Sequence, residues 1–96
     1  MDSPEISSRF SFIEGGEGRV LALRGDAITL DSSVPSPPGS RREAELEGAS
    51  LRFKVKVHAS RRQASGRFVL EGRLFDATKA VIDALTRGAQ AGATAG

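Results

Sequence analysis

Alternation of apolar and polar residues predicts a series of strands along most of the chain. In LRFKVKVH, residues 51–58, every second side chain is apolar, and the side chains between them are basic or histidine. Such alternation is typical of a strand that buries one face and exposes the other. Shorter stretches with similar alternation are RFSFI, RVLALR, AITL, RREAEL and SGRFVLEGRLF. We therefore expect about six strands before residue 76.

The sequence RVLALRGDAITL predicts a tight hairpin with Gly25 and Asp26 at its turn. Glycine at the first central position suits a type II′ turn, because φ is positive there. A two-residue turn brings the four large apolar side chains onto one face. The expected cross-strand pairs are Arg24 with Ala27, Leu23 with Ile28, and Leu21 with Leu30.

The basic side chains of residues 51–58 can be matched by carboxylates on neighbouring strands. If residues 47–50 connect two strands, the facing pairs are Leu46 with Leu51, Ala44 with Phe53, Glu45 with Arg52, and Glu43 with Lys54. Depending on where the turn after residue 60 ends, Glu71 faces either Lys54 or Lys56. Opposite charges facing across strands contribute about 0.2–1 kcal/mol each. An ordinary solvated face is therefore the favoured interpretation, and an anion-binding surface is the alternative.

The periodicity changes after residue 75. In DATKAVIDALTRG the apolar residues recur at helical spacing, which predicts a helix at about residues 76–87. Asp76 is the expected N-cap, and Arg87 followed by Gly88 is the expected end. Residues 1–8 are expected to form a flexible arm and residues 88–96 a disordered tail.

A small antiparallel sheet exposes two edges unless it closes on itself. We therefore expect a mostly β fold, a small six-stranded antiparallel β-barrel closed by one C-terminal α-helix. The 96 residues, 39% of them hydrophobic, suffice for a single domain. That domain is expected to span residues 9–87.

Charge and composition narrow the classes of function. The net charge is +2, and residues 41–73 carry nine Lys and Arg against four acidic residues, a local charge of +5. Five Phe and no Trp or Tyr leave few stacking surfaces for bases, which argues against nucleic-acid binding. Several arginines at strand ends and in turns are expected to have no acidic partner, and their guanidinium groups could bind phosphate. They are Arg41, Arg42, Arg61, Arg62, Arg67 and Arg73.

Enzymatic chemistry and cofactors are not expected. The chain has no Cys, and its single His58 excludes a cluster of His ligands for a metal. No Ser lies in a context that supplies a base, and His58 is interpreted as an exposed residue near a strand end. No apolar run approaches the roughly 18 residues of a membrane span, and no signal peptide is recognisable. We expect a cytoplasmic domain without metal, cofactor or membrane insertion.

Four parts of the chain resemble a PilZ domain, the bacterial family of cyclic-di-GMP receptors, over roughly residues 9–86. They are VLALRGDAITL, PPGSRREAEL, the strand pair LRFKVKVHAS and GRFVLEGRLF, and DATKAVIDAL. Members of that family bind the dinucleotide with RxxxR in the arm before the barrel and [D/N]xSxxG at the first turn. Here Arg9 stands alone in the arm. With Gly25 as the motif glycine, Ala22 and Val20 occupy the Ser and Asp/Asn positions.

The resemblance therefore implies a degenerate PilZ-like signalling or adaptor domain, of the kind found in motility systems. We expect it to act through an unidentified protein partner and to bind cyclic di-GMP weakly or not at all. The alternative is a cyclic-di-GMP receptor that uses non-standard arginines. The candidate ligand residues are Arg9, Arg19, Arg24 and Gly25. A second alternative is a small barrel that binds nucleic acid through residues 41–73.

Overall fold

The computed structural model describes residues 9–47 and 51–94, with side chains described up to residue 87. The arm expected at residues 1–8 lies outside the described residues. Within the described ranges the chain forms six strands and one helix: β1 (Arg9–Phe12), β2 (Glu17–Arg24), β3 (Ala27–Ser32), β4 (Arg41–Leu46), β5 (Leu51–Arg62), β6 (Phe68–Phe75) and α1 (Lys79–Thr94).

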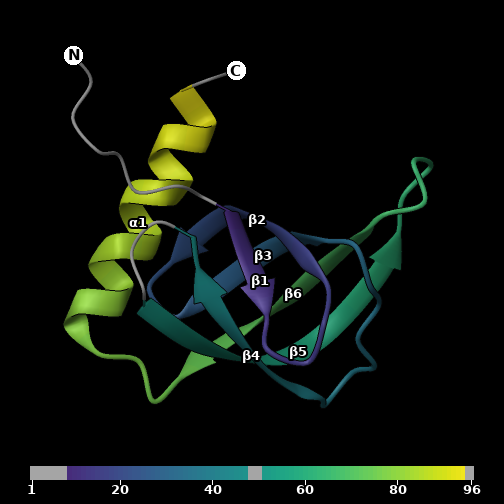
Figure 1. Ribbon diagram of the computed structural model, residues 1–96, viewed down its shortest axis with the longest axis horizontal. Coiled ribbons are helices and arrows are strands. Elements are labelled where there is room, and N and C mark those ends of the chain that lie inside the picture. The colour runs from purple at the N-terminus through teal and green to yellow at the C-terminus, as the bar shows by residue number, and fades with distance from the viewer. Residues whose placement is uncertain (1–8, 48–50, 95–96) are drawn as a thin grey trace.

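The six strands form a closed antiparallel barrel with the order β1-β2-β3-β6-β5-β4. The helix α1 packs against β2 and touches β5. In Figure 1 it lies along one side of the barrel, and the turn between β5 and β6 projects from the opposite side. The predicted fold, a six-stranded antiparallel barrel with one C-terminal helix, is confirmed.

The core fills the barrel and continues under the helix. Phe10 is buried, with its ring edge-to-face to Phe12 at 5.0 Å and to Phe53 at 5.5 Å between centroids. Edge-to-face pairs of this kind add about 0.5–1.5 kcal/mol beyond the burial of their area. The helix contributes one apolar face to the same core, through Val81, Ala84 and Leu85.

The hairpin between β2 and β3 has the predicted turn but a different register beyond it. Gly25 has a φ of +61°, and Leu23 faces Ile28 as expected. A bulge then shifts the pairing between Val20 and Ala22, so that Val20 faces Leu30. The prediction that Leu21 faces Leu30 inside the barrel is wrong, because the bulge leaves Leu21 unpaired and 44% exposed.

The pairing of β4 with β5 follows the prediction. All four expected pairs form: Leu46 faces Leu51, Ala44 faces Phe53, Glu45 faces Arg52, and Glu43 faces Lys54. The ion pair that forms is diagonal, from Arg52 to Glu43 at 3.8 Å. Both side chains are exposed to water, so the pair contributes little to stability.

The pairing of β5 with β6 differs from the prediction. Strand β5 continues to Arg62, and the turn lies at residues 63–66, where the amide of Gln63 donates to the carbonyl of Arg67. Because the turn comes this late, Glu71 faces Ala59 rather than Lys54 or Lys56, and a bulge then shifts the pairing between Ala59 and Val57. The Glu71 carboxylate instead accepts a hydrogen bond from Arg61 at 2.9 Å.

The helix begins later and ends later than its sequence pattern indicated. The hydroxyl of Thr78 accepts a hydrogen bond from the amide of Val81, so Thr78 is the N-cap. Asp76 has a φ of +53° and lies in the connection before the helix, which corrects the predicted N-cap. The helix passes through Gly88 to Thr94, so residues 88–94 are helical rather than a tail. Gly88 costs about 1 kcal/mol relative to Ala, and the alanines that follow favour the helix.

No helix within the described ranges combines the length and the apolar character that a membrane crossing requires.

Leu85 provides a test of how the helix is attached to the barrel. Its side chain is fully buried, so Leu85→Ala should leave a cavity and lower the free energy of unfolding by about 3 kcal/mol. Urea unfolding measures this change. Lys79→Ala, at an exposed position of the same helix, is the control, and a loss no larger than that of the control would contradict the described packing.

Candidate ligand pocket

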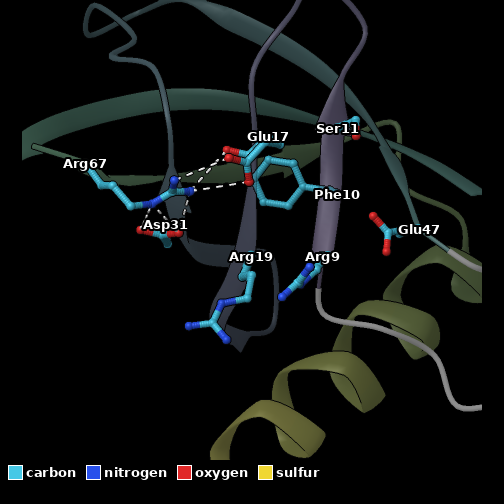
Figure 2. Close-up of a pocket in the computed structure, with 8 residues that line it drawn as sticks. All are labelled: Arg9, Phe10, Ser11, Glu17, Arg19, Asp31, Glu47 and Arg67. Carbon is cyan, nitrogen blue, oxygen red and sulfur yellow. Dashed lines mark hydrogen bonds and ion pairs between the residues drawn. The ribbon is translucent and has the colours of Figure 1, made fainter. Parts of the chain in front are cut away.

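A pocket of about 610 Å³ opens between the first three strands and the start of β6. Its lining is mostly charged, as Figure 2 shows, and comprises Arg9, Phe10, Ser11, Glu17, Arg19, Asp31, Glu47 and Arg67. The alternation of strands β1 and β2 produces this lining. Phe10 and Val20 point into the core, and the residues beside them in sequence therefore point outward.

Gly18 allows the pocket wall to form. It is buried between Glu17 and Arg19, and a Cβ at this position would collide with the backbone carbonyl of Asp31 and lie 2.9 Å from the ring of Phe10. The absence of a side chain lets β2 and β3 approach each other closely here. As a result, Glu17 and Asp31 lie near enough to share one cationic partner.

Arg67, just before β6, is that shared partner. Its Nε donates to both oxygens of Asp31, at 3.1 and 3.0 Å, and an Nη atom lies 2.9 Å from the same carboxylate. The other Nη atom is 3.3 Å from Glu17 (Figure 2). The hydrogen bonds to Asp31 and then to Glu17 hold the pKa of Arg67 above its usual value. The prediction that Arg67 is unpaired is therefore wrong.

Arg9 and Arg19 face each other across β1 and β2 on the other side of the pocket. Figure 2 shows the two side chains next to one another and away from the Arg67 cluster. Across β2 and β3, Arg19 also faces Asp31, whose carboxylate is directed to Arg67 instead. Among the described residues, Arg19 therefore has no hydrogen bond or ion pair.

The four predicted ligand residues do not converge on one place. Arg9 and Arg19 line the pocket, whereas Arg24 and Gly25 lie at the far end of β2 and do not line it. Arg24 follows Arg19 by five positions, a distance of roughly 16 Å along an extended chain. A single small ligand held by Arg9 and Arg19 would not reach the Gly25 turn.

Most of the other arginines that were expected to be unpaired have partners. Arg61 binds Glu71, as described above. The two others are Arg42, which donates to Glu14 at 3.1 Å, and Arg73, which lies 3.4 Å from Asp26. Long sequence separations explain these errors. The Arg67 contacts, for example, span 36 and 50 positions, and no local pattern in the sequence marks them.

The described part of the chain holds no group of three or more His, Asp and Glu side chains that could bind a metal ion. Comparison with known proteins found no matching family model, no matching curated protein and no matching solved structure.

The Arg67 cluster can be tested through stability. Because its guanidinium joins the start of β6 to both β2 and β3, Arg67→Gln should lower the melting temperature. Arg62→Gln is the matched control, since Arg62 is exposed and has no ion pair among the described residues. Thermal unfolding by circular dichroism measures both variants. Equal melting temperatures would show that the cluster contributes nothing to stability.

Proposed function

We propose that the chain is a PilZ-like signalling or adaptor domain that acts through a protein partner and binds cyclic di-GMP weakly or not at all. Two findings support a PilZ-like domain: the closed six-stranded antiparallel barrel and its C-terminal helix, which are the architecture that the resemblance implies. The family assignment itself rests on the sequence stretches described above.

The burial of Val20 is the observation that carries the proposal of weak or absent cyclic-di-GMP binding. Val20 stands where the family motif has Asp or Asn, and its side chain is 2% exposed inside the core. It therefore offers neither a polar atom nor access to a ligand. Ala22, at the motif Ser position, also has no polar side-chain atom. The contacts that would recognise a guanine base or a phosphate are missing from this turn.

The charge of the pocket supports the same conclusion. Its three arginines are balanced formally by Glu17, Asp31 and Glu47. Arg67 already donates to two of these carboxylates. A dinucleotide with two phosphates would have to compete with Asp31 and Glu17 for Arg67, because these two carboxylates already occupy its guanidinium group. A domain that lacks a strong small-molecule site would transmit its signal through contacts with another protein.

The alternative, a cyclic-di-GMP receptor with non-standard arginines, is favoured by one observation. Arg19, which has no ion pair among the described residues, faces Arg9 across β1 and β2 in the pocket. An anion bound there would accept hydrogen bonds from the Arg19 guanidinium. In this alternative the ligand contacts come from Arg9 and Arg19, without Arg24 or Gly25.

A titration with cyclic di-GMP separates these two functions. We expect the amide signals of ¹⁵N-labelled protein to show no saturable shift as cyclic di-GMP is added up to about 1 mM, a concentration that detects binding as weak as about −4 kcal/mol. Saturable shifts at micromolar concentrations near Arg9 and Arg19 would contradict the adaptor proposal. In that case Arg19→Gln should abolish the shifts, while Arg24→Gln, outside the pocket, should preserve them.

A further inference from the structure

Three basic side chains form a row across the outer face of the barrel. Arg41 of β4 faces Lys56 of β5, and Lys56 in turn faces Arg73 of β6. All three side chains are exposed. Since neighbouring strands lie about 4.8 Å apart, the row extends over roughly 10 Å. We call these three residues the outer basic row.

The charges of the outer basic row are only partly compensated. Arg73 has one exposed carboxylate nearby, Asp26 at 3.4 Å. Arg41 lies over the ring of Phe75, with its guanidinium carbon 5.6 Å from the ring centroid. Lys56, between the two arginines, has no ion pair among the residues that the structure describes. Like charges that face each other across strands are destabilising, so the fold keeps a repulsive arrangement here.

The row also lines a depression in the surface. A pocket of about 480 Å³ is formed by the three basic residues together with Phe75, and the carboxylates of Asp26 and Asp76 also lie in its lining. Phe75 is half-buried, and it also lines the neighbouring pocket beside Lys54. The surface thus combines a row of cations, one apolar ring and a concave shape.

We propose that the outer basic row is the docking surface for a short acidic segment of the partner protein. The inference rests on the partner-binding function proposed above and specifies the chemistry of the partner. In an extended segment, side chains two residues apart point the same way and lie about 6.7 Å apart. Two carboxylates at that spacing fit within the roughly 10 Å over which Arg41, Lys56 and Arg73 extend. An apolar side chain beside them would contact Phe75.

Several features favour a short acidic peptide over a nucleic acid. Single strands are bound by several aromatic rings on which successive bases stack. This surface has one ring, and the guanidinium of Arg41 already lies over it. Asp26 and Asp76 would repel a long polyanion that extends beyond the row. The two carboxylates of a short peptide can bind the basic residues without approaching these aspartates. The arrangement therefore selects a compact pair of negative charges.

A peptide-binding experiment tests the inference. The probe is a fluorescein-labelled peptide with two glutamates at alternate positions and a neighbouring leucine, and its control has glutamine in place of both glutamates. Fluorescence anisotropy with the full chain should show binding of the glutamate peptide alone, weaker at higher salt. Lys56→Gln should weaken that binding at least fivefold, and Arg62→Gln, which removes the same charge elsewhere on β5, should leave it unchanged.

Thermal unfolding shows whether these variants remain folded. Lys56→Gln removes the central charge of a repulsive row and should unfold at the same temperature as the original chain or higher. Equal binding of the two peptides, no binding of either, or equal effects of Lys56→Gln and Arg62→Gln would overturn the inference. A twelve-residue oligothymidylate that binds more tightly than the peptide, with Lys56→Gln weakening it, would also overturn it in favour of nucleic acid.

The experiment separates this inference from the function on which it rests. The cyclic-di-GMP titration reports on the pocket of Arg9 and Arg19, whereas the peptide reports on the outer basic row. If cyclic di-GMP causes no saturable shifts and the glutamate peptide does not bind, the docking inference is overturned and the adaptor proposal remains. Saturable cyclic-di-GMP binding would overturn the adaptor proposal whatever the peptide does.

Discussion

Closure of the barrel by the pairing of β1 with β4 is the constraint on which the rest of the structure depends. The ladder matches Phe10 with Leu46 and Phe12 with Ala44, so both rings of β1 enter the core. Hydrogen bonds from the amides of Ile13 and Glu47 extend it at either end, each at 2.9 Å. Without this short strand, both β2 and β4 would expose an unpaired edge. On its other side β1 pairs with β2, which brings Arg9 beside Arg19 in the pocket.

The two bulges and the length of β5 decide what the outer surface presents. The bulge in β2 turns Val20 into the core and Leu21 outward, which removes the side chain at a ligand-motif position from any contact with solvent. The bulge in β5 leaves His58 without a facing residue on β6. Because β5 continues to Arg62, the turn to β6 comes late and places Arg73 rather than Glu71 opposite Lys56. The basic stretch at residues 51–58 thus has carboxylates opposite Arg52 and Lys54 on β4, but an arginine opposite Lys56 on each neighbouring strand.

The pocket and the outer basic row differ in how their charges are compensated. In the pocket, a buried glycine allows Asp31 and Glu17 to approach Arg67, and the carboxylates balance the arginines. On the outer face, the one ion pair of the row within the described residues joins Arg73 to Asp26, at 3.4 Å. This difference is why we propose weak small-molecule binding for the pocket and partner binding for the row.

The sequence by itself determined the strands, the Gly25 turn, the register of β4 with β5 and the presence of a C-terminal helix. Each of these follows from local periodicity or from a turn of known length, which nearby residues specify. The sequence also identified Arg9 and Arg19 as candidate ligand residues. The positions of the bulges, the partner of Arg67 and the neighbour of Lys56 on β6 were decided only by the tertiary structure. A bulge shifts every later pair by one residue. Contacts such as that of Arg67 with Asp31 join residues that only the closed barrel brings together.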